Sequence, residues 1–145
     1  MALSATQYRR QMATTKTKLN VTLLRKVMKH ILEEPRRLRQ SEWLAKKGDA
    51  YYKHVPRKER PPCGTVACIA GWAVELSGVE VPTSPHVSTL ALNLLVKGND
   101  YHAEDLRDKL EYQLFMYFPQ GIAPSTLEYA QDVVRRTKEF IKDYA

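Results

Sequence analysis

The sequence predicts an all-α protein, a compact bundle of five or six helices around a buried central helix at about residues 65–77. Apolar residues recur every three or four positions over most of the chain, which is the period of an amphipathic helix. No segment has a convincing strand pattern. Residues 66–76 carry a single charged side chain, Glu75, and a helix that is apolar on all sides belongs inside a bundle. With 145 residues, one domain can bury a core without disulfides or a metal.

The net charge of +7 is distributed unevenly along the chain. Residues 1–60 hold 16 Lys and Arg against 5 Asp and Glu, whereas residues 61–145 hold 7 against 11. Residues 1–18 contain no acid, and we expect them to form a flexible basic arm before a single helical domain at 19–145. This uneven distribution of charge indicates an anionic partner for the basic half. It also fits an assembly in which that half meets the acidic surface of a partner or a second copy. The plain alternative is a solvated basic surface.

The first helices are predicted from an apolar stripe and its ends. Asn20 is expected to cap the first helix. The stripe of this helix consists of Leu23, Leu24, Val27, Met28, Ile31 and Leu32. Pro35 ends the helix or starts the next element, and a short second helix is predicted at 36–45. A polar and strongly basic loop follows at 48–62.

The later helices are predicted mainly from their ends. Thr65 is the expected N-cap of the central helix, and Gly78 is its expected C-terminal stop. The next helix ends at Gly98, and another is predicted at about 101–117. Ser125 begins a capping-box pattern and is expected to open the last helix.

Residues 63–73, with the sequence CGTVACIAGWA, resemble a motif of the form CGTxxCxAGxA in small bacterial and phage proteins. The flanks are similar too. Those proteins have an upstream amphipathic helix that ends near a proline and an aromatic residue, as Ile31, Pro35 and Trp43 do here. A Leu-Phe pair and an aromatic-Pro pair follow downstream, as at 114–115 and 118–119. The resemblance implies a fold and a bacterial or phage setting, and it supplies no catalytic residue.

The start of the central helix is the candidate ligand site. The first amides of a helix have no intrahelical partner, and with the helix dipole they attract an anion such as phosphate. Thr65 and the backbone at Gly64 are expected to hold the anion. The basic loop is expected to close over it with His54, Arg57, Lys58 and Arg60, and Tyr52 is placed to stack on a base. The alternative is that Thr65 only caps the helix and Gly64 only permits the turn.

The two cysteines, Cys63 and Cys68, have several interpretations. Core packing is the simplest, because a buried thiol behaves as a small apolar side chain. A disulfide between them is the second. A zinc site would combine both cysteines with His54 and needs a fourth ligand, for which His86 or His102 is the candidate. A catalytic Cys63 would need His54 as its base.

Other sequence signals narrow the class of protein. The chain lacks a Walker lysine loop, a dinucleotide-binding glycine turn, an HExxH pair and a Gly-x-Ser-x-Gly elbow. We therefore expect a protein that is not an enzyme and needs no cofactor. No apolar run approaches the roughly 18 residues of a membrane helix, and the first residues lack the apolar centre of a secretory signal. A cytoplasmic protein with reduced thiols is expected.

Together these observations predict a non-enzymatic binding protein for a phosphate-bearing ligand: a nucleotide, a signalling oligonucleotide or a nucleic acid. In a phage setting, such a protein would act on host defence or regulation. The alternative is a protein-interaction module or homo-oligomer that blocks a host factor. A zinc- or thiol-dependent protein is the third hypothesis.

Overall fold

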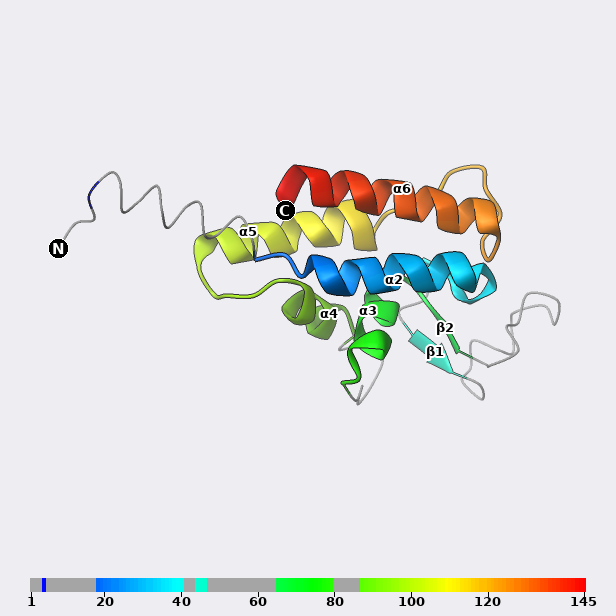
Figure 1. The fold of residues 1–145 in the computed structure, drawn as a ribbon, viewed down its shortest axis with the longest axis horizontal. Helices are drawn as coiled ribbons and strands as arrows, with labels where there is room; N and C mark the ends of the chain where they lie inside the picture. Colours follow the sequence, from blue (N-terminus) through cyan, green and yellow to red (C-terminus); the bar gives the residue numbers. More distant parts are fainter. Residues whose placement is uncertain (1–3, 5–17, 41–43, 47–64, 80–86) are drawn as a thin grey trace.

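The computed structural model describes residues 4, 18–40, 44–46, 65–79 and 87–145. Within these residues the chain forms helices that pack against one another, which confirms the predicted all-α bundle (Figure 1). The elements are α2 (Val21–Glu33), the short 3-10 helix η1 (Pro35–Arg37), β1 (Leu44–Lys46), β2 (Thr65–Ala67), α3 (Ile69–Ser77), α4 (Val87–Leu95), α5 (Tyr101–Leu110), the π-helical turn η5 (Glu111–Phe115) and α6 (Leu127–Tyr144).

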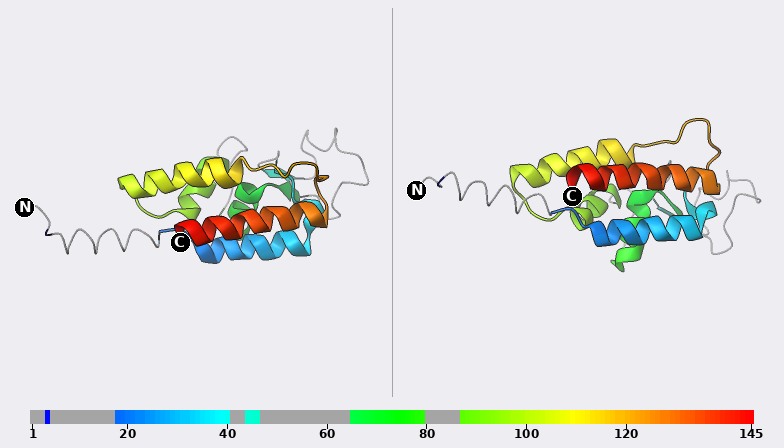
Figure 2. Two further views of the ribbon diagram at one scale, coloured as in Figure 1. Left: turned by 90° about the horizontal axis from the view of Figure 1, so that it is seen from above. Right: turned by 45° about the horizontal axis from the view of Figure 1, so that its top comes forward.

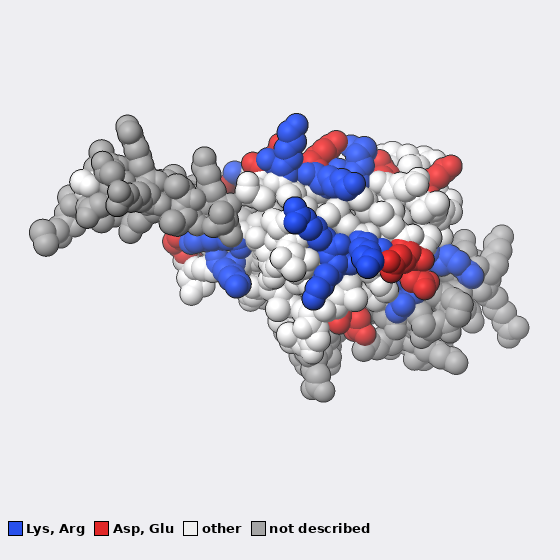
Figure 3. All heavy atoms as spheres, viewed as in Figure 1, with Lys and Arg blue, Asp and Glu red and all other residues white. Residues whose placement is uncertain are grey.

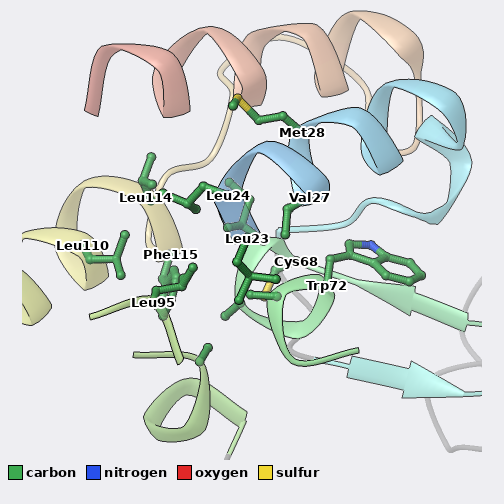
Figure 4. Packing of buried hydrophobic residues seen from close by; sticks show 14 of the residues in the cluster. Leu23, Leu24, Val27, Met28, Cys68, Trp72, Leu95, Leu110, Leu114 and Phe115 are labelled. Atoms are coloured by element: carbon green, nitrogen blue, oxygen red, sulfur yellow. The ribbon is translucent and has the colours of Figure 1, made fainter. Parts of the chain in front are cut away.

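Helices α2 and α6 lie side by side and run in opposite directions, as Figures 1 and 2 both show. Helix α3 packs against α2 on one side and α4 on another, and it also contacts η5. All residues of α3 from Ile69 to Val74 are buried. Figure 4 shows how side chains from α2, α3, α4 and α5 converge around this helix. Helix α3 is therefore the central, buried helix of the bundle, as the lack of charge in its sequence predicts.

The start of the central helix differs from the prediction. Thr65 lies in β2 and pairs with Lys46 of β1 in an antiparallel register, so it is not the N-cap. Helix α3 begins at Ile69, and the extended Cys68 is its N-cap. Thr65 and Val66 are β-branched and favour an extended backbone. Cys68 is thus just outside the helix rather than one turn inside it.

The helix predicted at 36–45 is also wrong. After one 3-10 turn at Pro35–Arg37, Leu38 is extended and forms a parallel bridge with Ala67. Strand β1 then pairs with β2, so Leu38 and residues 44–46 both pair with the segment 65–67. Each strand has three residues, which is too short for alternation to be recognised in a sequence.

Several helix ends are as predicted. The Asn20 side chain accepts a hydrogen bond of 3.1 Å from the amide of Leu23 and caps α2. Gly78 ends α3 with a φ of 80°, a left-handed conformation that glycine adopts without a Cβ penalty. In the described part of the chain, no helix is long and apolar enough to span a membrane.

The last two helices differ in detail from the prediction. The helix expected at 101–117 is α-helical to Leu110 and continues as the π-helical turn η5 to Phe115. The cap of α6 is Thr126, whose hydroxyl accepts a 3.2 Å hydrogen bond from the amide of Tyr129. Ser125 precedes the cap and has a φ of 63°, so it turns the chain into the helix instead of capping it.

Replacing Thr126 with Ala is expected to lower the free energy of unfolding by about 1 kcal/mol, because an N-cap oxygen is lost. Ser125→Ala removes only a long 3.4 Å contact to the carbonyl of Leu38, so we expect a change within about 0.5 kcal/mol. Urea unfolding of both variants measures the difference. A larger loss in the Ser125 variant would restore Ser125 as the cap.

Candidate functional site

Most residues of the predicted ligand site lie outside the described part of the chain. This holds for Tyr52, His54, Arg57, Lys58, Arg60, Cys63 and Gly64, so their grouping around a phosphate, and the zinc set, remain predictions. Of the candidate residues, the structure describes Thr65 in β2, Cys68 at the start of α3 and His102 in α5.

The start of α3 is closed to solvent. Cys68, Ile69 and Ala70 are at most 1% exposed. The amide of Ile69, the first of the helix, donates a 2.9 Å hydrogen bond to the side-chain oxygen of Gln40. Thr65 therefore lies before the helix instead of capping it, and the neutral side chain of Gln40 occupies the first amide donor of α3.

Gln40 is a buried junction between segments that are distant in the sequence. Its Nε2 donates hydrogen bonds to the carbonyls of Leu114 (3.0 Å) and Tyr117 (2.8 Å). Its own amide donates to the hydroxyl of Tyr129 at 3.3 Å. With the bond from Ile69, the side chain of Gln40 joins α3 to the end of η5, and its backbone amide adds α6 through Tyr129. Nothing in the neighbouring sequence distinguishes this glutamine from a surface residue, so the sequence alone does not predict its role.

Cys68 is completely buried within the apolar core, which supports its interpretation as a packing residue (Figure 4). Among the residues that the structure describes, no group of three or more His, Cys, Asp or Glu side chains is placed to hold a metal ion.

A cationic surface lies on α2 and α6. Arg25 and Lys26 on α2, and Lys138 and Lys142 on α6, are exposed. None of the four forms an ion pair or hydrogen bond with a described side chain. Figure 3 shows Lys and Arg atoms gathered over the face where these two helices lie. We call these four residues the cationic face.

A groove of about 530 Å³ opens between α2 and α6. Leu32 and Val134 contribute its apolar surface, and it is otherwise lined by Gln131, Arg135, Lys138, Glu139 and Lys142. The α6 residues recur at intervals of three and four, so they form one side of the helix. Leu32, expected in the buried stripe of α2, is 38% exposed and borders this groove.

Arg135 is paired with acidic side chains, whereas Lys138 and Lys142 of the groove have no acidic partner among the described residues. Arg135 contacts Asp132 at 3.0 Å and Glu139 at 2.7 Å, so its charge is shared within α6. It also donates to the hydroxyl of Tyr117, which itself donates to Asp132. The positive potential of the groove therefore comes mainly from Lys138 and Lys142.

A cluster around the titratable side chain of His30 lies where α2 meets α3. The ring of His30 packs 4.3 Å from the ring of Trp72, and the guanidinium of Arg37 lies 4.6 Å from the same indole. Trp72 donates a 2.9 Å hydrogen bond to the carbonyl of Arg37. The Nε2 of His30 is buried and has no hydrogen-bond partner among the described atoms. Burial, followed by the positive charge of Arg37, lowers the pKa of His30, and Glu34 and Glu33 oppose this more weakly.

Gln40→Leu is expected to lower the free energy of unfolding by about 3 kcal/mol, since one amide and two carbonyls lose their buried partner. Urea unfolding measures the loss. The matched control is Gln131→Leu, the same substitution at an exposed position on α6, where we expect a change within about 0.5 kcal/mol. Equal effects of the two substitutions would contradict the role of Gln40.

Acidification is expected to destabilise the fold partly through His30. Its pKa in the folded state is lower than in the unfolded chain, so the unfolded state binds the proton more tightly. The contribution of His30 to stability is fully present above its pKa in the unfolded chain, about 6.5. It is lost as the pH falls through its lower pKa in the folded state. Urea unfolding at several pH values should show a shallower loss for His30→Gln and the wild-type loss for His102→Gln. An unchanged profile in the His30 variant would contradict this.

Comparison of the chain with protein-family models, with curated proteins and with solved structures finds no match. The resemblance of residues 63–73 to small bacterial and phage proteins therefore remains a prediction, and the fold places Thr65 in a strand and Ile69–Ala73 in the central helix of this motif. What the protein binds has to be inferred from its own surface.

Proposed function

We propose that this protein is a non-enzymatic binding protein for a phosphate-bearing polyanion, with nucleic acid as the ligand. The observation that carries the proposal is the cationic face: exposed Arg25, Lys26, Lys138 and Lys142 on two adjacent helices have no acidic partner among the described side chains. Exposed cations without acidic partners attract phosphates and release counterions on binding.

The layout of the face favours an extended ligand over a single phosphate group. The charges lie on both α2 and α6, and Lys138 and Lys142 are about 6 Å apart along the helix axis. The apolar surface of Leu32 and Val134 lies in the groove between them. A compact cradle of amides would suit one phosphate, but here the first amide of the central helix is already bonded to Gln40. Separate cations along a groove suit a chain of phosphates better.

The chemistry of the face also fits binding without sequence readout. Lysines act as mobile point charges, whereas base recognition favours planar groups held in a fixed geometry. The predicted basic loop at 53–60 would add further charge to the same ligand. We therefore expect an affinity that depends strongly on salt and weakly on base sequence.

The test is fluorescence anisotropy of labelled single-stranded and double-stranded DNA and RNA at about 50 and 200 mM salt. We compare Lys138→Gln/Lys142→Gln with Lys97→Gln/Lys109→Gln, which removes the same charge near α4 and α5. The first variant should weaken binding at least tenfold and reduce the salt slope by about 0.9 for each lost duplex phosphate contact. The second should keep the wild-type slope.

Two outcomes would overturn the proposal. The first is the absence of binding to any of the four nucleic acids at the lower salt concentration. The second is an equal loss in both double variants, which would assign the binding to net charge and not to the cationic face.

A further inference from the structure

The outer side of α5 carries aromatic residues that no described part of the chain covers. Tyr101, Asp105 and Asp108 recur at intervals of four and three on one side of α5, and Tyr112 follows in η5. Tyr101 is 80% exposed, Tyr112 is 78% exposed and Met116 just beyond them is 51% exposed. Single exposed apolar residues are ordinary, but aromatic residues and methionine grouped on one surface are typical of the core of an interface.

The segment that carries them is also acidic. Residues 100–116 contain five carboxylates against two cations, and three of the carboxylates are ion-paired: Asp100 with Lys18, Glu104 with Arg107 and Asp105 with Lys109. One of these cations, Arg107, turns inward: its side chain is 12% exposed and donates to the carbonyls of Val96 and Gly98 at 3.2 and 2.6 Å. The carboxylates of Asp108 and Glu111 have no hydrogen bond or ion pair with a described residue. We call Tyr101, Asp108, Glu111, Tyr112 and Met116 the acidic aromatic face.

Such a surface suits a polypeptide segment that contains arginine. Guanidinium groups pair with carboxylates and also lie over tyrosine rings. An acid-free segment would add no repulsion against Asp108 and Glu111. Residues 1–17 of this chain have that chemistry, because they contain Arg9, Arg10 and Lys16 and no acidic residue.

The structure fixes the end of this segment beside the acidic aromatic face. Lys18 forms an ion pair with Asp100, the N-cap of α5. The carbonyl of Lys18 accepts a 3.1 Å hydrogen bond from the amide of Lys97, and the amide of Asn20 donates to Leu95 at 2.7 Å. Lys18, the residue that follows this segment, is therefore held at Asp100, the residue before Tyr101.

The length of the segment is sufficient for it to reach the whole face. Seventeen residues span up to about 56 Å when extended, and the eight residue steps from Arg10 to Lys18 span up to about 26 Å. Asp108 and Glu111 lie about 12 and 17 Å along the helix from Asp100. A short tether gives an effective concentration in the millimolar range, which a second copy reaches only in concentrated solution.

We propose that the acidic aromatic face is a docking surface for residues 1–17 of the same chain. Arg9 and Arg10 pair with Asp108 and Glu111, and they pack on Tyr101 and Tyr112. Docking there withholds these cations from an anionic ligand, so a polyanion and α5 compete for one basic segment. The proposal does not depend on the cationic face, which lies on α2 and α6.

The test is paramagnetic broadening in the full-length protein. A nitroxide is attached at Ala5→Cys in a Cys63→Ser background; Cys68 is completely buried and stays unreactive. At low salt, amide signals of residues 101–116 should broaden relative to the reduced label, and they should recover at high salt because exposed ion pairs are screened. Asp108→Asn/Glu111→Gln should abolish the broadening. The matched control is Glu128→Gln/Asp143→Asn, which removes two exposed carboxylates from α6 and should leave it unchanged.

A mixed sample identifies the occupant. Isotope-labelled protein without nitroxide is combined with unlabelled protein that carries it, so broadening of residues 101–116 then reports a segment from a second copy. Broadening only in the directly labelled chain supports the proposal. Broadening of equal strength in the mixed sample, or none in either sample, overturns it, and nucleic-acid binding by the same preparations tests the proposed function separately.

Discussion

The buried amide of Gln40 holds together segments that are distant in the sequence. It bonds to the first amide of α3, to two carbonyls at the end of η5 and, through its own backbone, to Tyr129 of α6. A glutamine in an apolar interior is tolerated only when its polar atoms are paired, and here both ends of the side chain are. The central helix can therefore start in the core without an exposed cap. The same bond occupies the first amide donor of that helix.

The π-helical turn η5 is linked to this junction. A π turn shifts the backbone register, so carbonyls near its end are released from the regular ladder and can take a side-chain partner. Leu114 and Tyr117 supply these carbonyls to Gln40. On its other side the same turn carries Tyr112 into solvent, with Met116 just beyond it. One irregular turn thus connects the interior of the bundle to its exposed aromatic surface.

Arginines and lysines have different roles on α5 and α6. Arg107 donates to backbone carbonyls, and Arg135 pairs with carboxylates of its own helix. Arg136 bonds to Gln113 at 2.8 Å and so ties α6 to η5. The planar guanidinium suits such fixed geometry. Lys138 and Lys142 have no such partner among the described side chains and retain their charge at the surface. These three arginines are therefore held in contacts within the fold, whereas the positive potential comes from the residues of the cationic face.

The sequence by itself determined the features that depend on neighbouring residues. Helical periodicity predicted the bundle, the lack of charge at 66–76 predicted the buried helix, and Asn20 and Gly78 were recognisable as helix ends because their partners lie within a few residues. Only the tertiary structure decided the rest. Residues 65–67 became a strand because 44–46 pair with them, and Gln40 became a core residue because its partners lie 29 to 89 positions away. The cationic and acidic aromatic faces likewise depend on which helices lie side by side and which charges turn inward, and local pattern does not encode contacts between distant segments.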